Sequence, residues 1–225
     1  MLSWVEIDED RLRSNIDAFR TVTAPGTALM VVVKSNAYGH GLEAVAPVAA
    51  ERADWLGVNC LDEAVVITRL GIQKPVAILG HTPLDQIETV VRNDYRQVLY
   101  RMDVAKALSA SAVRLGAAAR VHLKIETGTN RQGIALDRLP SFISELAALP
   151  GLEIEGIYTH FANIEDTLDP SFAIRQLDRF REALAVLGEL GVRPLLIHAA
   201  TTTGTLLYPN TQFTMIHLRI KTYKI

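Results

Sequence analysis

Short apolar runs alternate with longer amphipathic segments along most of the chain. Eight runs rich in aliphatic and β-branched residues predict strands: 29–33, 55–59, 75–79, 97–100, 120–125, 154–159, 195–198 and 213–220. The first run is apolar at every position, which is typical of a parallel strand buried on both faces. The amphipathic segments, together with one short stretch before the first strand, predict helices: 14–21, 42–53, 62–70, 84–92, 103–115, 136–149 and 170–190.

Eight strands with helical segments between them predict an α/β fold, a (β/α)8 TIM-type barrel. A length of 225 residues suits a single barrel, so we expect one domain over 1–225. A doubly wound open sheet is the alternative, because periodicity does not show whether a sheet closes. The first strand is not followed by the glycine fingerprint of a dinucleotide-binding fold.

Composition narrows the class of protein further. The 23 Lys and Arg residues nearly balance the 25 Asp and Glu residues, and a net charge of −2 argues against nucleic acid or an anionic membrane as the main partner. No apolar run reaches the roughly 20 residues of a membrane helix, and the first residues lack a signal-peptide pattern. With Cys60 as its only cysteine, the chain has no internal disulfide, so a cytoplasmic protein is expected.

Active-site residues of a barrel lie at the carboxyl ends of its strands. Polar residues that end the predicted strands are therefore the candidates for chemistry: Lys34, Asn59, His81, Lys124, Glu126, Arg131, His160, His198, Thr201 to Thr203, His217 and Arg219. The histidine and glutamate residues among these candidates are not spaced along the chain as metal ligands usually are, so no metal site is predicted.

Lys34 directly follows a buried strand. Burial lowers the pKa of a lysine amine and makes it a nucleophile that can form a Schiff base. A lysine that extends along the barrel rim toward water is the plain alternative. The polar loop over 35–41 contains two glycines, which allow a ligand to approach the backbone closely, and it brings Tyr38 near the lysine.

Threonines 201–203, followed by Gly204, come after the seventh strand, where barrels often bind phosphate. Hydroxyls and backbone N–H groups at a helix start form such a site, although an ordinary threonine N-cap has the same sequence. A Schiff-base lysine and a phosphate site in one barrel together indicate a phosphorylated aldehyde, and pyridoxal phosphate is the obvious candidate.

Two further residues suit an anionic or aromatic ligand. Arg131, in a turn-rich loop, has the forked donors to hold a carboxylate or a phenolate oxygen, or else it forms a surface ion pair. His160 ends the sixth strand, where it would stack on a ring or serve as a structural histidine.

The sequence over 32–41 (VVKSNAYGHG) resembles the cofactor-lysine signature of bacterial alanine racemases. Four more segments resemble that family and follow in its order along the chain: 4–8, 124–133, 158–162 and 198–209. The resemblance covers essentially the whole chain. It implies a pyridoxal-phosphate enzyme, an isomerase that interconverts L-alanine and D-alanine and supplies D-alanine for peptidoglycan of the cell wall.

The resemblance also implies residue roles. Lys34 would hold the cofactor and act as one of two proton-transfer bases, and Arg131 would bind the cofactor's phenolate oxygen and the substrate carboxylate. Lys124 matches a position that is carbamylated in some members, where it orients the arginine. The remaining matches would contact the phosphate, the ring or the rest of the cofactor: Tyr38, Thr202, His160, His217, Arg219 and Ile220.

The chain departs from the family's pattern toward its end. The family's eighth strand carries an arginine that bonds the pyridine nitrogen and then a glycine, and these positions are His217 and Arg219 here. Thr201 replaces an asparagine. The family also has a second, β-rich domain, which supplies a tyrosine base across a homodimer, and this chain stops with the barrel. We therefore expect weak or no racemisation by this chain alone.

Other functions remain open from the sequence. One is a single-domain pyridoxal-phosphate carrier, whose length fits but whose usual motifs differ around the lysine. Another is an inactive relic barrel, which the altered eighth strand suggests. Within the racemase interpretation, serine is the alternative substrate to alanine.

Overall fold

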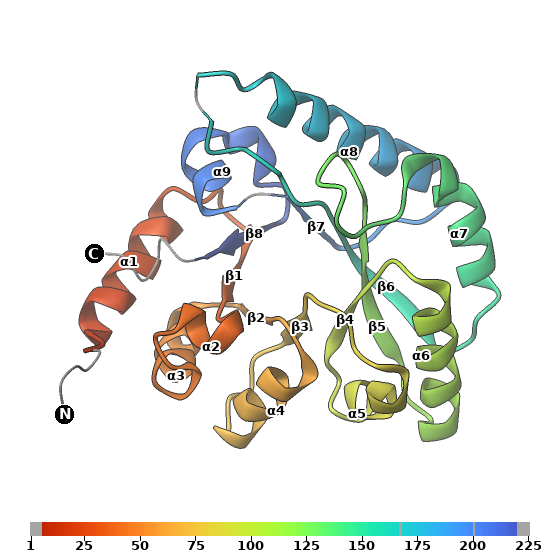
Figure 1. The fold of residues 1–225 in the computed structure, drawn as a ribbon, viewed down its shortest axis with the longest axis horizontal. Helices are drawn as coiled ribbons and strands as arrows, with labels where there is room; N and C mark the ends of the chain where they lie inside the picture. The colour runs from red at the N-terminus through yellow and green to blue at the C-terminus, as the bar shows by residue number, and fades with distance from the viewer. Residues whose placement is uncertain (1–5, 167, 200, 220–225) are drawn as a thin grey trace.

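A computed structural model describes residues 6–166, 168–199 and 201–219. Eight parallel strands pair in chain order and close into a barrel, with β1 joined to β8 through Ala28 opposite Met215. This confirms the predicted (β/α)8 barrel and excludes the open sheet (Figure 1). The strands are β1 (Ala28–Val32), β2 (Trp55–Val58), β3 (Val76–Ile78), β4 (Arg96–Leu99), β5 (Ala119–Lys124), β6 (Leu152–Tyr158), β7 (Leu196–His198) and β8 (Met215–Leu218).

Helices surround the strands (Figure 1). They are α1 (Glu9–Thr21), α3 (Leu42–Arg52), α4 (Leu61–Arg69), α5 (Ile87–Arg92), α6 (Met102–Leu115), α7 (Leu139–Ala147), α8 (Ser171–Glu189) and α9 (Thr202–Leu207), with 3-10 turns at Leu84–Gln86, Leu136–Arg138 and Pro209–Thr211. The first helix precedes the barrel and packs on α3, where Arg13 Nε lies 2.7 Å from Glu51 Oε2. Among the described helices, none has both the length and the apolar character needed to cross a bilayer.

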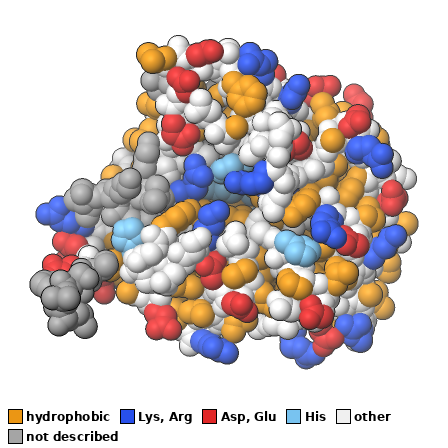
Figure 2. Space-filling view, in the orientation of Figure 1, with side chains coloured by type: hydrophobic (Ala, Val, Ile, Leu, Met, Phe, Trp, Pro, Cys, Tyr) orange, Lys and Arg blue, Asp and Glu red, His pale blue; other side chains and the backbone are white. Residues whose placement is uncertain are grey.

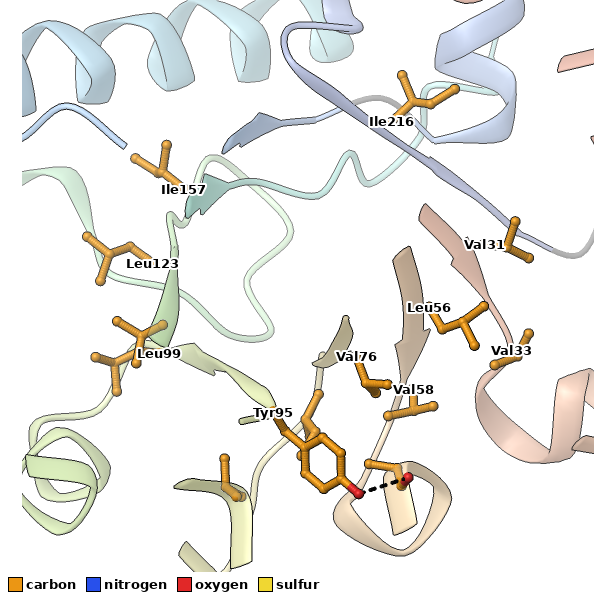
Figure 3. Packing of buried hydrophobic residues seen from close by; sticks show 14 of the residues in the cluster. Val31, Val33, Leu56, Val58, Val76, Tyr95, Leu99, Leu123, Ile157 and Ile216 are labelled. Atoms are coloured by element: carbon orange, nitrogen blue, oxygen red, sulfur yellow. Dashed lines mark hydrogen bonds between the residues drawn. The ribbon is translucent and has the colours of Figure 1, made fainter. Parts of the chain in front are cut away.

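Alternation along the strands separates two hydrophobic clusters. In β1, Leu29 and Val31 face the helices, whereas Met30 and Val32 face the barrel interior. Figure 3 shows part of the larger, outer cluster, in which strand residues such as Leu56 are fully buried against the helices. Because both faces of these strands are buried, the uniformly apolar sequence of β1 is the pattern a closed barrel requires.

The barrel interior is divided into an apolar half and a polar half. The apolar half comes mainly from β1 to β3, with Met30, Val32, Trp55 and Ala77 and with Met215 from β8. Five inward side chains of β5 to β8 are polar and buried: His122, Lys124, Tyr158, His198 and His217. Buried polar groups need partners inside the protein. The polar half is therefore where this barrel can carry chemistry.

A left-handed turn connects β1 to α3 and was predicted only as a polar loop. In this element, α2 (Lys34–Tyr38), residues 35–38 have φ between 52° and 56°. Left-handed backbone costs about 1–2 kcal/mol per residue that is not glycine. The Asn36 N–H donates to Glu63 Oε1 at 3.1 Å, and Asn36 Oδ1 accepts from the Leu42 N–H at 2.7 Å. These bonds to α4 and α3 offset part of the cost.

Replacing Asn36 by alanine is expected to lower the free energy of unfolding by about 1–2 kcal/mol, because the first turn of α3 loses its acceptor and alanine disfavours φ of 53°. Urea unfolding measures the change. Asn36→Gly is the matched variant, since it removes the same side chain but adopts the left-handed backbone freely. Equal stability of Asn36→Ala and the wild type would show that neither effect operates.

Candidate functional site

A cavity of about 190 Å³ lies at the carboxyl ends of the strands. It contains seven of the residues that the sequence singled out, with four others: Lys34, Asn59, Lys124, Arg131, His160, His217 and Arg219, then Val32, Leu79, Gln132 and Tyr158. Figure 2 shows Lys and Arg side chains beside a histidine near the centre of this face. The cavity is cationic, which suits an anionic ligand.

Lys34 is held at the rim of the barrel, one residue after the last fully buried position of the β1 region, Val33. Burial lowers the pKa of its amine, and the positive charges of Arg131 and Arg219 lower it further, while Glu63 opposes them. A larger share of the amine is therefore neutral near pH 7 than in a free lysine. A neutral amine is the form that attacks a carbonyl carbon.

Lys124 ends β5 and is a second amine in the same cavity. Its side chain is almost fully buried, and burial together with the charge of Arg131 lowers its pKa to about 8. Its Nζ donates to Gln132 Oε1 at 3.1 Å and lies 5.5 Å from the centre of the Tyr158 ring. A substantial fraction of this amine is therefore also neutral at a slightly alkaline pH.

Arg131 comes from a loop that is closed at its base. The Ile134 N–H donates to Lys124 O at 2.7 Å, and the Glu126 N–H donates to Ile134 O at 2.9 Å. Gly133 has φ of 146°, and a Cβ there would lie 2.5 Å from the backbone nitrogen of Glu126, so the closure requires glycine. Within the described residues, no carboxylate forms an ion pair with Arg131. The alternative role, a surface ion pair, is therefore not observed among these residues.

Arg219 and His160 form a pair across the cavity. Arg219 Nη1 lies 3.3 Å from His160 Nε2, and its Nη2 lies 3.5 Å from Glu165 Oε1. Burial, followed by the charges of Arg219 and Arg131, lowers the pKa of His160 to about 2. The imidazole is therefore neutral, and its Nε2 accepts a hydrogen bond from Nη1 of Arg219. The sequence placed both residues near the ligand, but it did not predict this contact.

The predicted phosphate contacts lie beside the cavity rather than in its lining. Thr202 is buried, and its Oγ1 accepts from the backbone N–H of Arg219 at 2.8 Å. Thr201 caps α9 by accepting from the Gly204 N–H at 3.3 Å, as the N-cap alternative predicts. Tyr38 packs against the barrel-interior cluster, where burial raises the pKa of its phenol.

Three remaining sequence-based candidates do not line the cavity. His81 is exposed, and Glu126 accepts from the Gly128 N–H within its own loop. His198 lies beneath the cavity, where its ring stacks on Tyr158 at 4.8 Å between centroids. Ile220 lies outside the described residues. No group of three or more His, Cys, Asp or Glu side chains in the described ranges is arranged to hold a metal ion.

Four lining residues had no predicted role. Gln132 and Tyr158 lie in segments that carry the resemblance, and Tyr158 pairs in register with Lys124. Leu79 follows β3, and Val32 lies on the inner face of β1. The sequence did contain a signal for Tyr158. Side chains alternate between the two faces of a strand, so Tyr158 is expected on the same face as His160, two residues further along.

The side chains present fit a phosphorylated aldehyde with an aromatic ring. Lys34 offers an amine of lowered pKa, and Arg131 and Arg219 offer guanidinium donors for anionic oxygens. His160 offers a neutral ring, and the start of α9 offers threonine hydroxyls close to Arg219.

Comparison with known proteins agrees with this geometry. The model of the family "Alanine racemase, N-terminal domain" matches residues 7–223. The curated alanine racemases of Symbiobacterium thermophilum and Syntrophobacter fumaroxidans are each 40% identical to this chain, over 95% and 98% of its length and over 56% and 59% of their own.

Solved structures give the same result. Alanine racemase of Clostridium difficile 630 in complex with cycloserine has a TM-score of 0.94 at 28% identity, over 99% of this chain and 62% of its own. Alanine racemase from D-cycloserine-producing Streptomyces lavendulae has a TM-score of 0.92 at 33% identity, over 97% of this chain and 58% of its own. The chain thus spans less than two thirds of the length of these relatives. Because the family model covers nearly all of it, the chain belongs to the family of alanine racemase N-terminal domains.

Proposed function

We propose that this chain is the catalytic barrel of a pyridoxal-phosphate-dependent alanine racemase that interconverts L-alanine and D-alanine. The observation that carries the proposal is the amine of Lys34. It lies at the end of β1 with a lowered pKa, in a cavity that also holds Arg131 and Arg219, in a chain of the alanine racemase family.

Each role follows from the position of a side chain. When bound, pyridoxal phosphate supplies an aldehyde for an amine and a ring that withdraws electrons from the substrate α-carbon. Lys34 holds this group and exchanges a proton at the α-carbon through its Nζ. Arg131 binds the substrate carboxylate from the closed loop. Arg219 and the hydroxyls near α9 bind the phosphate.

Racemisation needs a second base on the opposite face of the α-carbon, since a proton removed from one face has to return on the other. The resemblance assigns that base to a tyrosine of a second domain, and this chain spans 56% to 62% of the relatives described above. We therefore propose racemisation for the complete protein, acting as a cytoplasmic homodimer in the supply of D-alanine for peptidoglycan. Cofactor binding is proposed for this chain itself.

The first test is cofactor attachment. Pyridoxal phosphate followed by borohydride is expected to label Lys34, as located by peptide mass spectrometry. Lys34→Ala should abolish the label and, in the complete protein, lower alanine racemisation by a factor of about 10²–10⁴ or more through loss of a proton-transfer base. Lys106→Ala, on α6, is the control and should change neither result.

Each outcome of this test is informative. A label on Lys34 without racemisation of alanine or serine by the complete protein would favour a cofactor carrier. No label on a folded chain would contradict the proposal and favour an inactive relic barrel.

The second test is the pH profile of attachment. Because burial and the two arginines lower the pKa of Lys34, the rate of imine formation with pyridoxal phosphate should rise with pH and reach half-maximum below the ~10.4 of a free lysine. Arg131→Gln removes one positive charge and should move the midpoint to higher pH. Arg175→Gln, on α8, should leave it unchanged. Absorbance spectroscopy measures the rate, and a midpoint at the free-lysine value would contradict the account.

The third test concerns Lys124. Its pKa of about 8 and its place beside Arg131 and Gln132 support the proposal that its amine binds CO2 as a carbamate. NMR of the protein in ¹³C-bicarbonate is expected to show a carbamate carbon that Lys124→Met removes and Lys106→Met retains. Absence of the signal in the wild type at pH 8 to 9 would contradict this modification.

A further inference from the structure

Three histidines form a continuous hydrogen-bonded row inside the barrel. His217 Nε2 lies 2.6 Å from His198 Nδ1, and His198 Nε2 lies 2.9 Å from His122 Nδ1. The exposed fractions of His122 and His198 are 0%, and that of His217 is 6%. The row runs from the cavity, which His217 lines, toward the amino-terminal end of the strands.

A carboxylate ends the row. His122 Nε2 lies 3.2 Å from Glu155 Oε2, and Arg96 Nε donates to the same oxygen at 3.0 Å. Burial raises the pKa of Glu155, but the hydrogen bonds from His122 and Arg96 outweigh it and bring the pKa to about 2. Glu155 is therefore ionised at neutral pH, and an ionised carboxylate only accepts hydrogen bonds.

All three imidazoles are neutral. Burial lowers the pKa of His122 and lowers that of His198 well below its ordinary value. Burial, together with the charges of Arg219 and Lys124, lowers the pKa of His217 to about 3. A neutral imidazole has one N–H donor and one acceptor nitrogen.

Each hydrogen bond then fixes the next. Since Glu155 only accepts, His122 carries its proton on Nε2 and offers Nδ1 as an acceptor. His198 donates to that nitrogen from Nε2, so its own Nδ1 accepts from Nε2 of His217. The single N–H of neutral His217 is thus used in the hydrogen bond to His198. The nitrogen of His217 that lies outside the row is Nδ1, which is an acceptor, and His217 lines the cavity.

The backbone is adapted to this row. Val121 pairs with Ile154 and His122 pairs with Gly156, so Glu155 is the extra residue of a β-bulge in β6. A Cβ at Gly156 would lie 2.9 Å from Cγ of His122, so only glycine leaves room for the imidazole. The Tyr158 ring stacks on His198 with an interplanar angle of 5°. These contacts hold the rings and the carboxylate in line.

We propose that Glu155, through His122 and His198, holds His217 as a hydrogen-bond acceptor in the cavity, so that the site selects a ligand with an N–H or O–H at that point. The identity of the ligand rests on the proposed function. For pyridoxal phosphate the group is a ring nitrogen that carries a proton. Lys124 and Arg219 line the same cavity and disfavour a positive ring, so protonation depends on the hydrogen bond to His217.

The tautomers can be read without any ligand. Long-range ¹H–¹⁵N NMR of the chain labelled with ¹⁵N-histidine is expected to show His122, His198 and His217 as neutral rings with the proton on Nε2. A proton on Nδ1 of His217, or a doubly protonated ring, at pH 7 would overturn the proposal. This result does not depend on whether the chain binds pyridoxal phosphate.

A pair of variants tests the role of the carboxylate. Glu155→Met removes the terminal acceptor and is expected to replace the single His217 tautomer by a mixture. Glu153→Met is the control, because Glu153 lies on the same strand but forms an exposed ion pair with Arg120. An unchanged single tautomer in folded Glu155→Met would overturn the role of Glu155. If that variant does not fold, the wild-type spectrum decides whether His217 is an acceptor.

The bound state separates this inference from the proposed function. Pyridoxal phosphate labelled with ¹⁵N in the ring is expected to give the chemical shift of a protonated nitrogen when attached to the wild-type chain. His217→Phe, which has no acceptor, should return the shift to that of an unprotonated ring. Attachment with an unprotonated ring nitrogen in the wild type would refute the inference and leave the function intact. If pyridoxal phosphate does not attach, the proposed function is refuted. The tautomers of the three histidines are then decided by the NMR spectrum of the ligand-free chain.

Discussion

The interior of a closed barrel excludes bulk water, so every polar side chain inside it has to find its partner within the protein. This chain meets the constraint by collecting its inward polar residues on β5 to β8 and leaving β1 to β3 apolar. The row from His217 to Glu155 satisfies the deep histidines one after another. The cationic groups that this row does not include, Lys34 and Lys124 among them, lie around the cavity, where an anionic ligand can reach them.

The same exclusion of water sets the chemistry of the cavity. Burial lowers the pKa of both lysines and of His160, and the guanidinium groups add to the effect in each case. Two lysines whose amines lose their protons more readily than a free lysine therefore share one small space with a neutral imidazole. A lysine on the protein surface would be protonated there and would not act as a nucleophile.

The end of β8 carries two residues, His217 and Arg219, at which the sequence departs from the pattern of the family that it resembles. Where the resemblance leads one to expect an arginine and a glycine, His217 extends the buried row and Arg219 pairs with His160 and Glu165. Both replacements are connected to neighbouring side chains through hydrogen bonds or ion pairs. The altered strand thus has a defined geometry, and the acceptor role that we propose for His217 depends on it.

Sequence alone predicted the barrel and most of the residues of the cavity, and the structure decided that the sheet closes. The strands follow from local apolar runs. Residues at the carboxyl ends of parallel barrel strands meet at one mouth, so the sequence pointed to residues that line the cavity: Lys34, Lys124, Arg131, His160, His217 and Arg219. Resemblance in the segment around Lys34 then indicated the chemistry. The left-handed backbone of residues 35–38 was not predicted, because it depends on Glu63 of another helix.

Tertiary structure alone decided how the buried groups are connected. His122 is 33 residues from Glu155 and 76 from His198, and a bulge places Glu155 within reach. No local pattern encodes a contact across that separation. Protonation states likewise depend on the tertiary structure, since the pKa of a side chain depends on its burial and on the charges around it. The sequence supplies the residues that react, and the closed barrel decides which of them carry a proton.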